Sequence, residues 1–170
     1  MLFPEHSFFR KGGGHPVGIL SVRRLAPRKE LQACIKDIWL FESAGGLSGD
    51  DLRLVVPNGS AKLMLYYRGH FAGRVCGRTF ALPEHRLFVI GASDRPASTD
   101  FDRNRPFGCI CIELHPAFAY RVLAVPQHEL MDNIVPLDAL FRPPELRSAE
   151  ERLATTSDPV KKAWLLQDVV

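Results

Sequence analysis

The residue types best suited to chemistry gather in one stretch, Phe107–His115, which reads FGCICIELH. Successive side chains of a β-strand point to opposite faces of the sheet, so Cys109, Cys111 and Glu113 would share one face with His115. Two thiols on one face suggest a soft metal site or an oxidation sensor. Neither cysteine belongs to a CxxC pair and both have apolar neighbours, so we expect two small residues buried in the core.

Glu113 is the unusual residue of this stretch, because a carboxylate between apolar neighbours needs either water or a partner. In solvent it is an ordinary ionised side chain, whereas in a pocket burial raises its pKa and a partner is required. The sequence favours a solvent-exposed Glu113, and a buried, ligand-binding Glu113 is the alternative.

The motifs of common enzyme classes are absent from the sequence, which contains no HExxH, GxSxG, P-loop or GxGxxG pattern. The histidines never form an HxH pair, the spacing that places two imidazoles side by side on one strand face. A lone histidine in a strand is usually a hydrogen-bonded structural residue. We therefore predict no metal, no cofactor and no enzymatic activity; the histidines are His6, His15, His70, His85, His115 and His128.

Short apolar segments, separated by turn residues about every ten positions, predict the elements that hold these side chains. This spacing is typical of an antiparallel β-sandwich or barrel, here of about eight strands. A short helix is expected over Arg28–Ile35, because Pro27 precedes apolar residues at helical spacing. The predicted strands are Val17–Val22, Asp37–Ser43, Asp51–Pro57, Ala61–Tyr67, His70–Cys76, Arg86–Ile90, Ser98–Phe101 and Phe107–Leu114.

Aromatic residues on the predicted strands suggest a cavity for a small ligand, although most aromatic residues of a barrel only pack in its hydrophobic core. Strand alternation puts Trp39 on the other face from Leu40, and Met64 and Tyr66 on the other face from Leu65. The candidate ligand-binding residues are Trp39, Met64, Tyr66, His70, Phe101 and Glu113, with Tyr67 as a further aromatic side chain.

The hydrophobic period changes from two to about 3.6 at Pro116, so helices are expected from there onward. Pro116 suits a first helical turn, because its fixed φ fits the helix and its missing N–H is not needed there. Asp158 is the expected N-cap of the final helix. The helical segments predicted beyond this first one are Pro126–Met131, Glu145–Ala154 and Asp158–Val170, with a connection or helical turn in Val135–Phe141.

These elements divide the chain into a flexible arm over residues 1–16, a barrel over 17–115 and a helical segment over 116–170. The last helix stops without a C-cap, so we expect it to lead into a further domain.

The end of the last helix is apolar around most of its circumference, more than one contact with the barrel can cover. A homodimer that buries Trp164, Leu166 and Val170 is one expectation. Docking of the helix on its own barrel, or on the further domain, is the alternative.

Composition limits the location and partners of the protein. The net charge is +3 at pH 7 and the Lys and Arg residues are scattered, which argues against direct contact with nucleic acid. Four cysteines without paired spacing fit reduced thiols in a cytoplasm. No signal peptide or long apolar run is visible, so we predict a cytoplasmic protein that does not enter the membrane.

Several short motifs follow one another in a distinctive order between about residue 25 and residue 170. They are Pro27, Leu31, Ile35 and Trp39; Leu54-Val55-Val56-Pro57-Asn58-Gly59 with Lys62-Leu63; Gly91; Ile112-Glu113-Leu114-His115-Pro116-Ala117-Phe118; Leu123; and Glu129-Leu130-Met131-Asp132 with Val135 and Leu137. Their order and spacing resemble the N-terminal sensor domain of AraC-type bacterial transcription regulators, in a subgroup of long-uncharacterised sensor domains.

The resemblance implies an α+β fold, with a mainly antiparallel, cupin-like β-barrel followed by a helical C-terminal segment. In that family the barrel binds a small effector or mediates dimerisation, and a C-terminal pair of helix-turn-helix units contacts DNA. The helix-turn-helix half is absent from this sequence, so the resemblance assigns no DNA-contacting residue here. The family shares no fixed effector-binding motif, and the effector is therefore unknown.

Three functions are compatible with the sequence. We favour an effector-sensing and dimerisation domain of a transcription regulator. The second is a small cupin-type enzyme, such as a sugar isomerase or an oxygenase, and the missing HxH pair argues against it. The third is a ligand-free adaptor whose barrel serves only to pair subunits.

Overall fold

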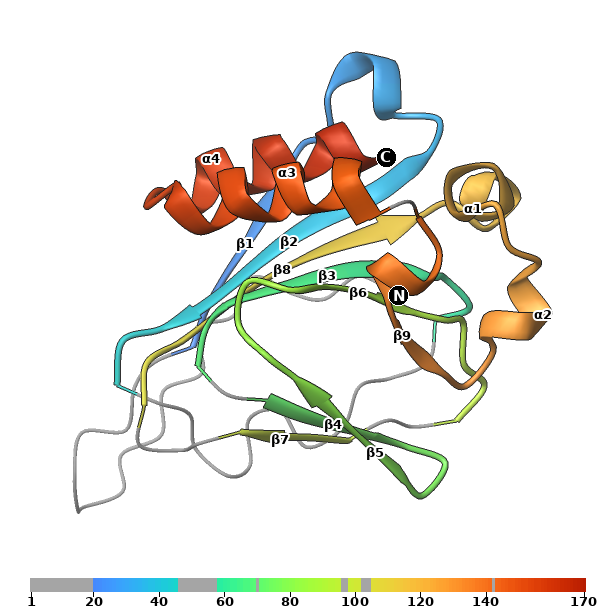
Figure 1. Ribbon diagram of the computed structural model, residues 1–170, viewed down its shortest axis with the longest axis horizontal. Helices are drawn as coiled ribbons and strands as arrows, with labels where there is room; N and C mark the ends of the chain where they lie inside the picture. The colour runs from blue at the N-terminus through green and yellow to red at the C-terminus, as the bar shows by residue number, and fades with distance from the viewer. Residues whose placement is uncertain (1–19, 46–57, 70, 96–97, 102–104, 142) are drawn as a thin grey trace.

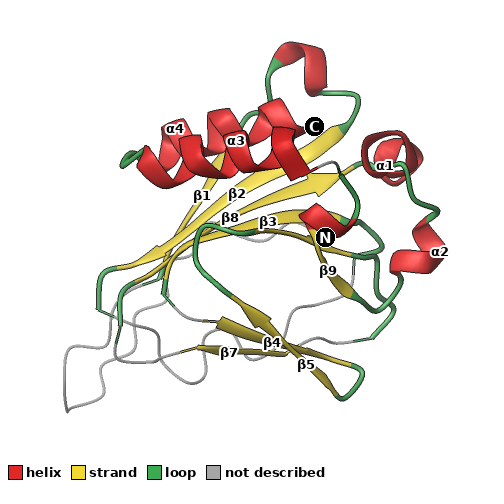
Figure 2. Ribbon diagram, in the orientation of Figure 1, coloured by secondary structure: helices red, strands yellow, loops and turns green. Residues whose placement is uncertain are grey.

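Two antiparallel sheets and a layer of helices make up the structure, a computed structural model that describes residues 20–45, 58–69, 71–95, 98–101, 105–141 and 143–170 (Figure 1). The two sheets lie one above the other, and the C-terminal helices cover the outer side of the larger sheet (Figure 2). The predicted α+β class with mainly antiparallel strands is confirmed.

The strands are β1 (Ser21–Leu25), β2 (Ile35–Ser43), β3 (Lys62–Arg68), β4 (Phe71–Val75), β5 (Arg78–Leu82), β6 (Leu87–Ile90), β7 (Ser98–Phe101), β8 (Phe107–Leu114) and β9 (Ile134–Pro136). A six-stranded sheet has the order β1-β2-β8-β3-β6-β9, and a three-stranded sheet has the order β5-β4-β7. The helices are α1 (Pro116–Leu123), α2 (Gln127–Leu130), α3 (Pro143–Thr155) and α4 (Pro159–Leu166), with 3-10 turns η1 (Lys29–Leu31), η2 (Leu137–Ala139) and η3 (Gln167–Val169).

Strand β8 lies between β2 and β3, and all eight of its residues are buried. Its alternating side chains separate two apolar clusters, one on each face of the larger sheet. On the outer face, Ile110 and Ile112 pack in one cluster with residues of α3 and α4, including Leu166. On the inner face, Cys109 and Cys111 pack in a second cluster with residues of the smaller sheet. The predicted assignment of faces along this strand is therefore confirmed.

The predicted helix over Arg28–Ile35 is wrong. This segment contains only the 3-10 turn Lys29–Leu31, and Ile35 is the first residue of β2, where it pairs with Leu114. Ile35 is 1% exposed, so burial in the sheet decides its structure. A helix of two turns has little stability of its own and yields to such packing.

Two strands, β5 and β9, are not predicted by the sequence. Most of β5 is exposed, including Arg78 and Thr79, so no apolar alternation marks it. The strand β9 is three residues long, contains Pro136 and lies within the segment predicted as helical. Both lie at sheet edges, where a strand pairs on one side and tolerates proline and polar residues.

Several predicted elements lie in parts of the chain that the structure does not describe. The arm over residues 1–16, the strand Asp51–Pro57 and residues 17–19 of the first predicted strand lie outside the described residues. The first described strand is β1, three residues of which follow Val22.

The expected helix starts after β8 are confirmed, whereas the last helix, expected over Asp158–Val170, ends at Leu166 with Gln167 as its C-cap and is followed by the 3-10 turn η3. Pro116 is the first residue of α1, and Asp158 caps α4 by accepting the Val160 N–H at 2.8 Å. Within the described part of the chain, every helix is too short or too polar to span a bilayer.

Candidate functional site

Three rows of side chains cross the inner face of the larger sheet. The strand register places Asp37, Glu113 and Lys62 side by side on β2, β8 and β3, and we call these three residues the charged row. Next to this row the inner face is apolar. One apolar row contains Trp39, Cys111, Met64 and Phe88, and the next contains Phe41, Cys109 and Tyr66.

Four of the predicted ligand-binding residues therefore share this face. Met64 and Tyr66 are buried and Trp39 is half-buried, all within the cluster between the sheets. From the smaller sheet, the Phe71 ring lies 4.2 Å from the Tyr66 ring, measured between centroids. Trp39, Tyr66 and Phe71 thus form an aromatic surface between the charged row and the smaller sheet.

The remaining predicted residues are placed only in part or elsewhere. Phe101 pairs through its backbone with Phe71 in the smaller sheet, and His70 lies outside the described residues. Tyr67 belongs to the outer face, where the Lys162 ammonium lies 5.8 Å from its ring centroid. Tyr67 is therefore not part of the inner face.

The expectation that Glu113 faces solvent is wrong, because the residue is only 8% exposed. Two partners compensate its burial: the Asn58 Nδ2 group donates a hydrogen bond to Oε1, and the Lys36 ammonium lies 3.8 Å from Oε2. An amide donor and an ammonium beside a buried carboxylate offset part of the cost of removing it from water. Glu113 is thus a buried, partnered member of the charged row.

Sequence reasoning did not assign two residues beside Glu113, Lys62 and Asn58, to the candidate site. The Lys62 ammonium donates to Asn58 Oδ1 at 2.9 Å and to the Ser60 carbonyl at 3.3 Å. The Asn58 side chain thus links Lys62 to Glu113. A usable signal existed for Lys62, because strand alternation puts it on the same face as Met64. Asn58 looked like a turn residue before Gly59, which does adopt a positive φ of 69°.

The other end of the charged row is closed by a second ion pair. Arg24 on β1 pairs with Asp37, and its guanidinium also lies 5.8 Å from the centroid of the Trp39 ring. A cation over an indole face is attracted by the ring quadrupole. This contact orients Trp39 beside the charged row.

The thiols of the inner face are buried, which disfavours their thiolate form. Burial raises the pKa of Cys109 well above its usual value, and raises that of Cys111 to about 12. Since the thiolate is the nucleophile and the metal ligand, these cysteines are small core residues, as predicted. Burial likewise raises the pKa of Tyr66. The described inner face therefore offers polar and apolar contacts but no activated nucleophile.

The donors needed by a metal ion do not converge. Within the described residues, no three His, Cys, Asp or Glu side chains lie close enough to hold one. His85 lies in a turn, His115 precedes α1 and His128 is exposed on α2. The described residues thus do not provide the ligand set of the metal that many barrel enzymes carry. That the protein is metal-free stays a prediction.

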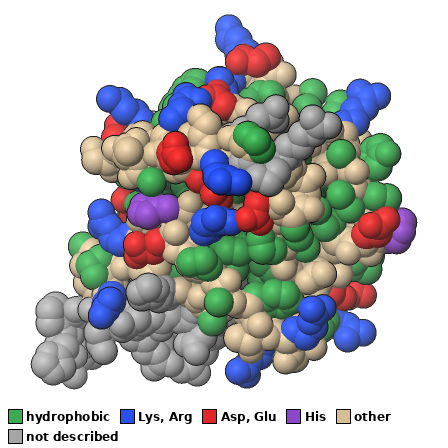
Figure 3. Space-filling view, viewed as in Figure 1, with side chains coloured by type: hydrophobic (Ala, Val, Ile, Leu, Met, Phe, Trp, Pro, Cys, Tyr) green, Lys and Arg blue, Asp and Glu red, His purple; other side chains and the backbone are tan. Residues whose placement is uncertain are grey.

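A shallow depression of about 380 Å³ lies on the other side of the larger sheet. Both of its carboxylates are paired, since Arg86 contacts Asp138 and Glu150, and Glu150 also accepts the Leu87 N–H at 3.1 Å. These contacts fasten α3 to β6. Basic and acidic side chains are interspersed on this side of the molecule (Figure 3). The depression is accordingly a structural ion network.

The predicted dimer residues have different environments. Trp164 is 50% exposed on α4, whereas Leu166 is fully buried in the cluster under the helices. Val170 is half-buried against the same cluster. The helix docks on its own sheet through Leu166, so the expectation that this residue pairs subunits is wrong. Trp164 is the member of the three that keeps a large exposed apolar surface.

The fold is similar to several solved structures. The cupin domain of an XRE family transcriptional regulator from Enterobacter cloacae shares 18% identity, with a TM-score of 0.44 over 57% of this chain and 97% of that one. The Cnp3 cupin domain of Schizosaccharomyces pombe shares 9% identity, with a TM-score of 0.46 over 63% of this chain and 72% of that one. The AraC-like transcriptional activator CuxR shares 14% identity, with a TM-score of 0.38 over 88% of this chain and 59% of that one. Each TM-score lies below 0.5, so these likenesses assign no function to the chain.

No curated protein matches the sequence. Residues 23–136 match the model of a family described as Domain of unknown function (DUF6597). The match covers more than half of the chain and runs from β1 to β9, so it includes the charged row and both faces of the larger sheet. The chain therefore belongs to the DUF6597 family.

Proposed function

We propose that the protein is the effector-sensing and dimerisation domain of a cytoplasmic AraC-type transcription regulator, and that it is not an enzyme. The observation that carries this proposal is the inner face, where Trp39, Met64 and Tyr66 line an apolar surface beside Glu113. Small-molecule sites typically combine such an apolar wall with a few convergent polar groups. The two thiols of this face, Cys109 and Cys111, are buried, and burial raises the pKa of each and so disfavours the thiolate.

The motif residues that carry the resemblance to the regulator family make contacts that determine the local structure, which supports the proposal. Asn58 holds the buried Glu113, and Pro116 begins α1 directly after β8. Gly91 contacts the Leu130 backbone so closely that a Cβ atom there would lie 1.7 Å from the carbonyl oxygen. These positions connect the inner face, the end of β6 and the first helices, so the resemblance concerns the frame of the site.

The sheet also offers a route from an effector to the helices. Each of β2 and β8 contributes side chains to both clusters: Trp39 points inward while Ile38 and Leu40 pack under the helices. An effector that orders the inner face would bias the outer packing through the same strands. In this proposal DNA is contacted by a helix-turn-helix domain outside this sequence, and two copies associate through the exposed side of α4.

A thermal-shift screen of small molecules against the purified chain tests the sensor function. A ligand that binds only the folded protein raises its melting temperature by mass action. We expect hits whose shift is lost in Trp39→Ala and kept in the matched control Trp164→Ala, because Trp164 lies on the opposite side of the sheet. Hits whose shift survives Trp39→Ala would place the ligand away from the inner face, and only the absence of any hit in a broad screen would support the ligand-free adaptor.

A further inference from the structure

We propose that the effector is a small monocarboxylate with an apolar body, and that the Lys62 ammonium binds its carboxylate. The inference deepens the proposed sensor function and rests on it. Its basis is the pairing of charges along the charged row.

The charges of the row and its surroundings pair off, with one exception. Asp37 pairs with Arg24, and Glu113 pairs with Lys36 while accepting a hydrogen bond from Asn58. Lys62 donates only to neutral oxygens, those of Asn58 and Ser60, and forms no ion pair with any described residue. Among the described residues, the three cations Arg24, Lys36 and Lys62 and the two carboxylates therefore leave one positive charge, located at Lys62.

The position of Lys62 directs this charge toward the inner face. Lys62 is half-buried, lies across from Glu113 on β8 and across from Ile90 on β6, and precedes Met64 on the same face of β3. Its charge acts to lower the pKa of Cys111, against the larger effect of burial, so its field reaches the apolar row. A partly dehydrated ammonium at an apolar surface attracts an anion more strongly than one in water does.

The neighbouring side chains define the rest of the ligand. Met64, Phe88 and Trp39 form the adjacent apolar row, and Ile90 packs against the same cluster. A carboxylate bound at Lys62 would direct a short alkyl chain or one aromatic ring along this row. The binding free energy of such a ligand would have two contributions, the burial of its apolar body and one charge-assisted hydrogen bond to Lys62.

The same charges disfavour other ligand classes. A phosphate dianion would add two negative charges beside Glu113, whereas the unpaired charge is one. A cation would be repelled by Lys62 and would find Glu113 already bound to Asn58 and Lys36. A monoanion is the class whose charge the row complements.

Matched ligand triplets test the assignment on the purified 170-residue chain. Hexanoate, hexanamide and hexylamine form one triplet, and phenylacetate, phenylacetamide and phenethylamine form another, with inorganic phosphate as a separate probe. Calorimetric titration should give at least about tenfold tighter binding for a carboxylate than for its amide or amine. Lys62→Gln should remove this preference, Lys62→Arg should retain it, and the exposed-lysine control Lys161→Gln should match the wild type.

The outcomes separate the two proposals. A carboxylate preference that survives Lys62→Gln, equal binding of acid and amide, or tighter binding of phosphate overturns the carboxylate assignment. If amides or amines bind in a Trp39-dependent manner, the ligand class is wrong while the sensor function stands. If no triplet binds at millimolar concentration, the carboxylate assignment fails, and the broad thermal-shift screen decides the sensor function separately.

Discussion

Adjacent residues of β8 illustrate how one strand serves two surfaces. Ile112 is fully buried under the helices, and Glu113 is buried on the inner face with polar partners. We expect Ile112→Asp to lower the free energy of unfolding by several kcal/mol, roughly 3 or more, because the new carboxylate has no partner there. Glu113→Gln should cost only about 1 kcal/mol, since a Gln side-chain oxygen still accepts from Asn58.

Urea denaturation of the two variants and the wild type measures this difference. Glu113→Leu, which also removes the acceptor for Asn58, is the matched companion and should cost more than Glu113→Gln. An inverted order, with Glu113→Gln more damaging than Ile112→Asp, would mean that the faces of β8 are misassigned by one residue.

The buried Lys162 should make the free energy of unfolding depend on pH. Its side chain is 3% exposed, donates to the Leu153 carbonyl and makes no ion pair with a described residue. Burial lowers the pKa of Lys162 from 10.5, so the unfolded chain binds this proton more tightly than the folded one. The wild type should therefore gain stability relative to Lys162→Met as the pH rises toward 10.5. Urea melts of both proteins at pH 7 and pH 9.5 measure the change, and a difference that stays flat or falls contradicts the prediction.

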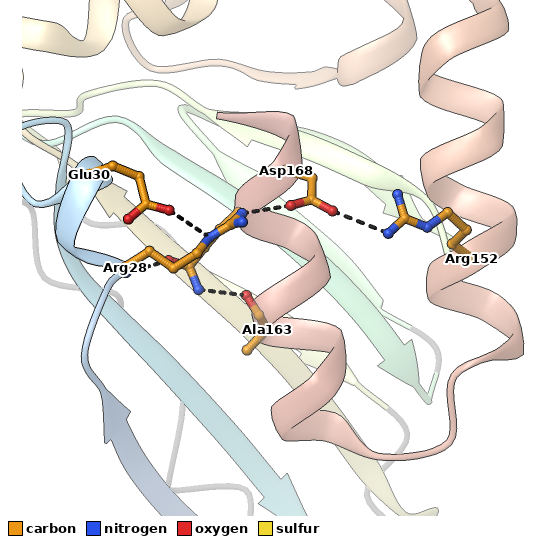
Figure 4. Close-up of polar contacts among 6 residues, drawn as sticks. Arg28, Glu30, Arg152, Ala163 and Asp168 are labelled. Atoms are coloured by element: carbon orange, nitrogen blue, oxygen red, sulfur yellow. Dashed lines mark hydrogen bonds and ion pairs between the residues drawn. The ribbon is translucent and has the colours of Figure 1, made fainter.

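At the scale of elements, polar contacts fasten the C-terminal turn η3 to the β1–β2 connection (Figure 4). Gln167 is 2% exposed, accepts the Arg28 backbone N–H at 2.8 Å and donates to the Ala163 carbonyl at 3.2 Å. Asp168 bridges the guanidinium groups of Arg28 and Arg152 nearer the surface. The turn thus joins a strand connection at one end of the chain to α3 at the other.

We expect the buried amide to matter more than the exposed ion pairs. Gln167→Leu keeps the size but leaves the Arg28 N–H without a partner, which should cost about 1–3 kcal/mol of unfolding free energy. Asp168→Asn should cost less than about 1 kcal/mol, because its ion pairs are partly solvated. Denaturant melts rank the two variants, and a larger loss for Asp168→Asn would show that the ion pairs carry the junction.

The end of β6 depends on a glycine for a different reason. A Cβ atom on Gly91 would lie 1.7 Å from the Leu130 carbonyl oxygen, and backbone cannot yield as a side chain does. Gly91→Ala should therefore cost about 3 kcal/mol or more. Gly77→Ala is the control, because Gly77 has a φ of +78° with nothing within 4 Å, and strain alone should cost about 1 kcal/mol. Thermal denaturation compares them, and equal losses would count against the predicted steric clash.

The sequence predicts elements well where side-chain period and burial agree. The change of period at Pro116 marks the end of β8 and the start of α1, because the strand is buried on both faces and the proline fixes the first turn. Edge strands such as β5 carry too little apolar pattern to be recognised. The alternation on β3 placed Met64 and Tyr66 on one face correctly, but no local pattern links Asn58 to Glu113 across 55 positions. Such long-range polar pairs follow from strand register, which a single sequence does not specify.

For the whole molecule, the larger sheet is the element that both clusters share. The inner cluster joins it to the smaller sheet, and the outer cluster joins it to α3 and α4. A protein interior is close-packed, so a change in side-chain positions on one face is felt on the other. In the proposed sensor, effector binding at the charged row would therefore affect helix docking through β2 and β8, and the exposed side of α4 is where such a change would reach a second subunit.

The last prediction concerns association through that side of α4. Trp164 is 50% exposed, and a half-exposed indole gains from burial at an interface, where tryptophan often dominates the binding energy. We expect sedimentation at micromolar concentration to show the mass of a homodimer, the oligomeric state that most often has two-fold symmetry. Trp164→Ser should weaken association by about tenfold or more, whereas the control Tyr120→Ser should not, although Tyr120 is equally prominent on α1 at 57% exposure. A wild-type monomer, or a dimer unaffected by Trp164→Ser, would refute this interface and leave α4 as a helix that serves only its own sheet.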